Sequence, residues 1–116
     1  MNFKTWLEQD DEKFKDLPKF LSAKELFGSV SLEDHEDLFG RFDFAKGSDK
    51  KLLDAKYKWA KDRGLVDDIL KNGIKNPLEI HVDNYGDQTL TDGHHRLAIA
   101  LKHFPKTPLP IKYWSG

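Results

Sequence analysis

The chain contains no cysteine, and this absence excludes several kinds of chemistry at once. Without a thiol the protein can form no disulfide, no thiolate nucleophile and no Cys-ligated zinc site. The chain also lacks any run of about 18 apolar residues, the length that crosses a bilayer. Its N-terminus has neither the basic start nor the apolar middle of a signal peptide. We therefore expect a cytoplasmic protein with no membrane partner.

Net charge is almost absent as well, at −1 for the whole chain, which argues against a strongly basic duplex-binding protein. The two parts of the chain nevertheless differ. Residues 1–45 contain six Lys or Arg against eleven Asp or Glu, whereas residues 46–116 contain thirteen against nine. The basic second part is consistent with a ligand that carries phosphate, and chance asymmetry of a solvated surface explains it equally well.

The composition, 38% hydrophobic and 34% charged over 116 residues, is typical of one soluble globular domain. We expect a single domain over 1–116, with an acidic helical N-terminal part (1–45) and a core (46–116). Apolar spacing and capping signals predict helices over 3–16, 22–27, 32–39, 49–63 and 65–72. Ser22 and Ser48 are the expected N-caps, and Gly28 and Gly64 the expected ends, of the helices beside them. Residues 40–47 are predicted as a loop or a short strand.

Apolar stripes on the fourth and fifth predicted helices are expected to face the core. Their members are Leu52, Ala55 and Trp59, with Leu53, Tyr57 and Ala60 beside them, and then Leu65, Val66, Ile69 and Leu70. Alternation predicts a hairpin of strands 78–82 and 88–91, followed by a helix that begins near His94 and a last strand over 109–114. This mixture of elements predicts an α+β fold with a small mixed sheet.

The clearest chemical signal is the stretch Asp92-Gly93-His94-His95-Arg96, where a strand end, a tight turn and a helix start meet. The first backbone N–H groups of a helix have no intrahelical partner, and the helix dipole favours negative charge there. Basic side chains in a first turn oppose that dipole unless an anion offsets them. The stretch therefore predicts a site for phosphate or another anion, with Arg96 as the best-suited side chain.

Other interpretations of this turn remain open. Asp92 could simply cap the helix, and His94, three residues before Leu97 on the inward stripe, could be buried for structural reasons. A metal site built from His94, His95 and Asp92, with His81 and Glu79, is disfavoured because adjacent helical residues point about 100° apart. Any metal is expected to be Mg²⁺ that a nucleotide brings, held through Asp92 and waters.

The order of these parts resembles the ParB/sulfiredoxin superfamily, in the manner of small phage and plasmid proteins with a "ParB-like nuclease domain". The resemblance covers residues 65–114 and rests on segments 71–82, 92–100 and 110–113; residues 20–26 are similar to the first strand and helix of such domains. It implies a small mixed sheet with packed helices and a phosphate-binding strand–turn–helix.

Within the superfamily, the local motif is most similar to the free-serine kinase branch, whose Asp-Gly-His-His-Arg cradles nucleotide phosphates and is matched from Asp92 to Arg96. ParB partition proteins carry Gly-Glu-Arg-Arg at this turn, so only Gly93 and Arg96 match them. Sulfiredoxins need a Cys that this chain lacks. Such kinases also use a carboxylate base outside the motif, for which the candidates are Glu79, Glu33 and Glu36.

The resemblance implies a protein that binds a nucleotide (ATP, ADP or CTP, with Mg²⁺) or a nucleic-acid phosphate such as that of DNA. Nuclease, kinase or NTPase activity would be compatible with such a site, and whether the protein is an enzyme stays open. An alternative hypothesis is a non-enzymatic phage-type protein that binds a host protein through its acidic N-terminal half. If a phage encodes it, its location is the cytoplasm of the host cell.

Overall fold

The structure of the protein is a computed structural model that describes residues 14–32 and 46–116. Helices and strands alternate along these residues, so the expected α+β class is confirmed. In chain order the elements are β1 (Phe20–Ser22), α2 (Ala23–Ser29), β2 (Ser31–Leu32), α4 (Lys46–Asp62), α5 (Leu65–Asn72), β3 (Leu78–Val82), β4 (Gln88–Asp92), α6 (His94–His103) and β5 (Pro108–Trp114).

The five strands form one mixed sheet in the order β1-β5-β3-β4-β2. The predicted hairpin, β3 with β4, is antiparallel, as is the pair of β1 and β5. The other two pairs, β3 with β5 and β2 with β4, are parallel. Both edge strands therefore come from residues 20–32, which are joined to each other through α2.

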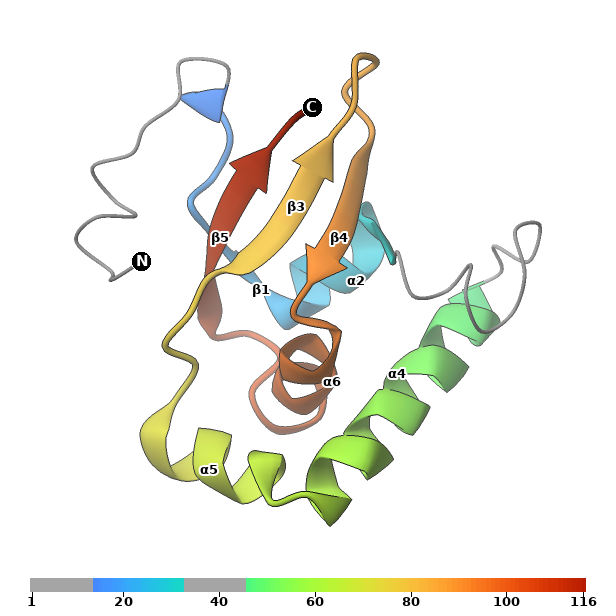
Figure 1. Cartoon of the computed structure of the whole chain (residues 1–116), viewed down its shortest axis with the longest axis vertical. Helices are drawn as coiled ribbons and strands as arrows, with labels where there is room; N and C mark the ends of the chain where they lie inside the picture. Colours follow the sequence, from blue (N-terminus) through green and yellow to red (C-terminus); the bar gives the residue numbers. More distant parts are fainter. Residues whose placement is uncertain (1–13, 33–45) are drawn as a thin grey trace.

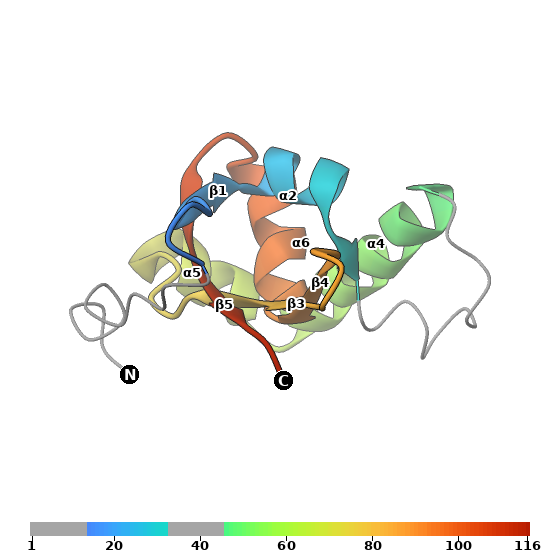
Figure 2. The same cartoon turned by 90° about the horizontal axis from the view of Figure 1, so that it is seen from above.

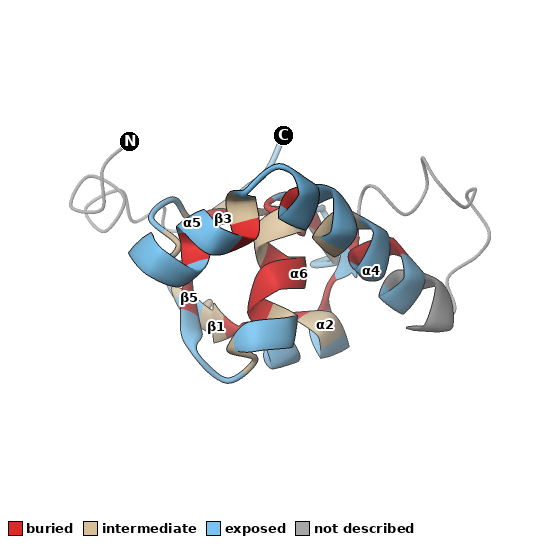
Figure 3. Ribbon diagram, turned by 90° about the horizontal axis from the view of Figure 1, so that it is seen from below, coloured by how far each residue is buried: buried red, intermediate tan, exposed pale blue. Residues whose placement is uncertain are grey.

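Helices α2 and α6 lie on one face of the sheet, and the opposite face of β5, β3 and β4 is turned toward the viewer in Figure 1 (Figures 1 and 2). Alternation along β3 sends Leu78 and Ile80 to the helix side, where they are fully buried with Leu97 of α6 and Leu26 of α2. Helix α4 packs mainly against α6, and α5 packs mainly against α4. Seen from below, α6 forms the buried centre that the other helices surround (Figure 3).

The capping box predicted at the start of α2 is present. The backbone N–H of Glu25 donates to Ser22 Oγ at 3.2 Å, and the backbone N–H of Ser22 donates to Glu25 Oε1 at 3.0 Å. Two orphan donors of the helix start are thereby satisfied. The helix does not end at Gly28 as predicted; it continues to Ser29, and Val30 is its C-cap, whose N–H donates to the carbonyl of Leu26.

The helix predicted over 32–39 is wrong at its start, where the structure has a strand. Ser31 and Leu32 form β2, whose residues pair with Thr89 and Leu90 of β4. A Ser-x-x-Asp pattern is only a local signal, and burial of Leu32 against the sheet outweighs it. Residues 3–13 of the helix predicted over 3–16, residues 33–39 and the segment 40–45 lie outside the described residues, and residues 14–16 are not α-helical.

Two details of α4 and α5 also differ from the prediction. Helix α4 begins at Lys46, so Ser48 lies within it and is not its N-cap. The side that α4 buries carries Leu52, Leu53 and Ala60, whereas Ala55 and Trp59 are exposed because the helix meets α6 along the second stripe. In α5, Val66 and Ile69 are buried, but Leu70, expected to face inward, is exposed.

Candidate functional site

The backbone of the predicted turn has the expected form, and its glycine is fixed by geometry. β4 ends at Asp92, Gly93 is the N-cap with a φ of 107°, and α6 begins at His94. A Cβ placed on Gly93 would lie 2.8 Å from Cγ of Leu78, which is fully buried in β3. The turn therefore needs glycine both for its left-handed backbone and for its close approach to the neighbouring strand.

The start of α6 carries no capping side chain. Gly93 offers none, and no acidic residue lies in the first turn. The interpretation in which Asp92 caps the helix is therefore not supported. What the first turn contains instead is His94, His95 and Arg96, close to the positive end of the helix dipole.

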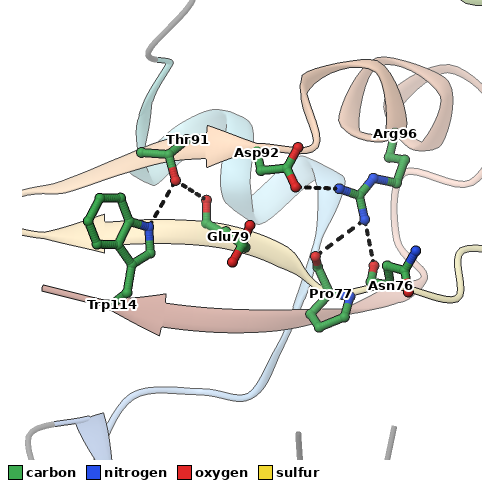
Figure 4. Close-up of polar contacts among 7 residues, drawn as sticks. All are labelled: Asn76, Pro77, Glu79, Thr91, Asp92, Arg96 and Trp114. Carbon is green, nitrogen blue, oxygen red and sulfur yellow. Dashed lines mark hydrogen bonds and ion pairs between the residues drawn. The ribbon is translucent and has the colours of Figure 1, made fainter. Parts of the chain in front are cut away.

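Arg96 is bound to the protein on three sides (Figure 4). Its Nη1 donates to the backbone carbonyl of Asn76 at 2.7 Å and to that of Pro77 at 3.3 Å. Its Nη2 lies 3.3 Å from Oδ2 of Asp92, whose side chain is mostly exposed. Arg96 thus joins the helix start to the segment that enters β3, a structural role that sequence reasoning missed because these carbonyls are about 20 residues away along the chain.

The two histidines of the motif have different surroundings. His94 is buried, with 4% of its surface exposed, as its place on the inward stripe suggested. His95 is half-buried, and its ring centroid lies 4.5 Å from that of Trp59 in α4. Of the two, His95 is therefore the one that a ligand at the surface can reach.

Trp59 extends the site beyond the predicted motif. The guanidinium carbon of Arg63 lies 3.9 Å from the centre of the Trp59 ring, and Arg63 Nη1 donates to the carbonyl of Trp59 at 3.4 Å. We call Trp59, Arg63 and His95 the indole cluster. Sequence reasoning favoured packing over base stacking for Trp59; its spacing of one helical turn from Arg63 was the available signal for a cation–π pair.

The candidate base Glu79 lies beside the turn, because its register partner in β4 is Asp92. Its own carbonyl accepts a hydrogen bond from Thr91 Oγ1 at 3.2 Å, and Thr91 Oγ1 accepts one from Trp114 Nε1 at 3.0 Å (Figure 4). Trp114 belongs to β5 and Thr91 to β4, so the indole crosses the open face of β3, the strand between them. There the ring centroids of Trp114 and His81 lie 4.4 Å apart.

The remaining predicted site residues, Glu33 and Glu36, lie outside the described residues, as do most of the acidic residues on which the host-binding hypothesis depends. In 14–32 and 46–116, no three His, Asp or Glu side chains come together as a metal site would require. No helix in the same two segments is long and apolar enough to cross a membrane. A hollow of about 340 Å³ lies elsewhere, between the end of α5 and the segment 104–110 that leads from α6 into β5, and is lined mainly by apolar residues.

Comparisons with known proteins add no family to this picture. No family model matches the chain, and no curated protein or solved structure is significantly similar to it. Function must therefore be argued from the turn and the residues around it.

Proposed function

We propose that the protein is a ParB-like domain that binds a nucleotide or a nucleic-acid phosphate at the turn from Asp92 to Arg96. The observation that carries this proposal is the start of α6, a helix with no side-chain cap, no acid in its first turn and three basic residues there. A cation at that end opposes the dipole by about 0.3–1 kcal/mol unless an anion offsets it, and in the structure Arg96 is paired with Asp92. A bound phosphate would reverse this cost and accept hydrogen bonds from the first-turn N–H groups.

Each group around the turn would make a different contact with the ligand. Backbone N–H groups of α6 would hold the phosphate, and His95 would contact it from the rim of the site. Arg96, whose contacts to Asn76 and Pro77 hold the turn in shape, would contribute positive charge and its remaining N–H groups. Asp92, exposed at the end of β4, would meet Mg²⁺ carried by a nucleotide through water.

Phosphotransferase or nuclease activity is a further step that would need a general base. Among the described candidates, Glu79 has the better position, since it is paired in register with Asp92. Loss of turnover in Glu79→Gln with unchanged nucleotide affinity would identify this role.

The binding proposal is tested by calorimetric titration of the purified protein with tripolyphosphate, ATP, ADP and CTP, each with and without Mg²⁺, and with a single-stranded oligonucleotide. In His95→Asp, a carboxylate enters the first turn, which suits the helix dipole but repels phosphate. We expect this variant to fold and to bind at least about tenfold more weakly, a loss of about 1.4 kcal/mol.

Asn84→Asp is the matched control, because it adds the same negative charge at the exposed turn between β3 and β4. Its affinities should stay within about twofold of the wild type, as expected for a screened distant charge. No binding of any probe by the wild type, or equal losses in the two variants, would refute the proposal.

A further inference from the structure

Trp59 is an exposed tryptophan on α4. It keeps 45% of its surface exposed even though the side chains of Arg63 and His95 both contact its ring. It belongs to neither of the two hydrophobic clusters of the described residues, and its indole N–H donates to no described residue. The ring of Trp59 therefore contacts Arg63 and His95 without belonging to the core.

The neighbours of the ring indicate what kind of ligand it would suit. Arg63 and His95 are both able to carry positive charge, and they flank an electron-rich aromatic surface. A planar ring stacks on indole, and an anionic group attached to that ring would meet the two cations. Nucleotides combine a planar ring with an anionic group, whereas inorganic phosphate has no ring that could stack on the indole.

The position of the cluster joins it to the turn. His95 is the second residue of α6 and also the residue whose ring lies 4.5 Å from Trp59. A ligand with its phosphate at the helix start would therefore have Trp59 as an aromatic neighbour across His95. Trp114, the other exposed tryptophan of the described residues, is held on the sheet by Thr91 and His81.

We infer that Trp59 is the surface on which the base of a nucleotide stacks while its phosphates occupy the start of α6. This inference rests on the proposed function and narrows its ligand class from phosphates in general to nucleotides. Arg63 holds the indole in place along α4 and adds charge beside the base, and His95 connects the base to the phosphate site.

The test compares tripolyphosphate with ATP and CTP on the wild type, Trp59→Leu, Trp59→Phe and Trp114→Leu, with circular dichroism to check the fold of each. Stacking predicts that the wild type binds the nucleotides about tenfold more tightly than tripolyphosphate. Trp59→Leu should remove this difference, because it weakens the binding of ATP and CTP more than the binding of tripolyphosphate. Trp59→Phe should retain part of the difference in affinity between the nucleotides and tripolyphosphate. Trp114→Leu should retain all of it.

The possible failures are distinguishable. If tripolyphosphate and the nucleotides bind the wild type equally well, the stacking inference fails and the phosphate site stands. If Trp114→Leu rather than Trp59→Leu removes the difference, the base lies on the sheet face and the inference is wrong. If no probe binds, the proposed function fails and this inference fails with it.

Discussion

Gly93 is subject to two independent constraints, its backbone φ of 107° and the 2.8 Å that would separate a Cβ at this position from Cγ of Leu78. Left-handed backbone alone would permit another residue at a modest energetic cost. The contact with Leu78 is harder to relieve, because that side chain is fully buried and Cγ is not at its flexible end. The residue that shapes the turn before α6 is thus also one that fixes α6 against β3.

Gly93→Ala should therefore destabilise the protein by about 3 kcal/mol, the sum of backbone strain and overpacking. Gly86→Ala is the matched control, because Gly86 also has a positive φ, 85°, but nothing lies within 4 Å of a Cβ there. The control should cost only about 1–2 kcal/mol. Urea unfolding followed by circular dichroism measures both values, and equal losses would show that the approach to Leu78 is unimportant.

The site was predictable from sequence where its signals are local and not where they are distant. The turn, its glycine and the start of the helix at His94 follow from neighbouring residues and are present as predicted. The carbonyl partners of Arg96 are not local, and they arise only when the segment before β3 is placed beside α6. The contact of Trp59 with His95 likewise depends on how α4 packs on α6, which no pattern within either helix specifies.

At the level of elements, two similar capping patterns have different outcomes. Ser22 and Glu25 form the predicted capping box, because both partners lie at the start of a helix whose Ala23 and Leu26 are buried. Ser31 begins the second pattern, yet its backbone and that of Leu32 pair with β4. A cap signal predicts a helix start only if no neighbouring strand offers those backbone groups another partner.

The capping box should also give the protein a specific pH dependence. The backbone N–H of Ser22 and, to a smaller extent, its side chain lower the pKa of Glu25 below the ordinary value of 4.5. A carboxyl whose pKa is lower in the folded state stabilises the fold above its unfolded pKa, and this contribution is lost as the pH falls through the folded-state value.

When the pH is lowered from 7 to about 3, below the range where glutamate ordinarily titrates, the urea concentration at the midpoint of unfolding should therefore fall. The fall should be larger for the wild-type protein than for Glu25→Gln. Glutamine can still accept the bond from the Ser22 N–H but does not titrate. Parallel pH profiles of the two proteins would contradict a role for the ionised carboxylate.

In the molecule as a whole, α6 separates two groups of buried residues. On one side the sheet packs with α2, α6 and part of α4 in the larger cluster. On the other side Ala60, Val66, Ile69 and Ile99 form a smaller cluster that joins α4, α5 and α6. Both buried residues of α5, Val66 and Ile69, belong to this smaller cluster, so the attachment of α5 depends on few side chains.

Ile99→Ala should consequently cost about 3 kcal/mol of unfolding free energy, because Ile99 is fully buried where the three helices meet. Amide hydrogen exchange should also become faster in α5 than in the sheet, since local opening follows the loss of local contacts. Leu70→Ala, on the exposed side of α5, should cost less than about 1 kcal/mol. Uniformly faster exchange in all elements would instead indicate that the two clusters unfold together.

The origin of the sheet edges has a kinetic consequence. β1 pairs with β5, so Phe20 finds its partner Pro110 only across almost the whole length of the chain. On the ribosome, β3 and β4 can form their hairpin early, but β1 must wait for the final strand to emerge. Closing such distant pairs requires a large loss of chain entropy before any contact compensates for it, which slows folding. The sheet is therefore expected to be completed only after β5 has been synthesised.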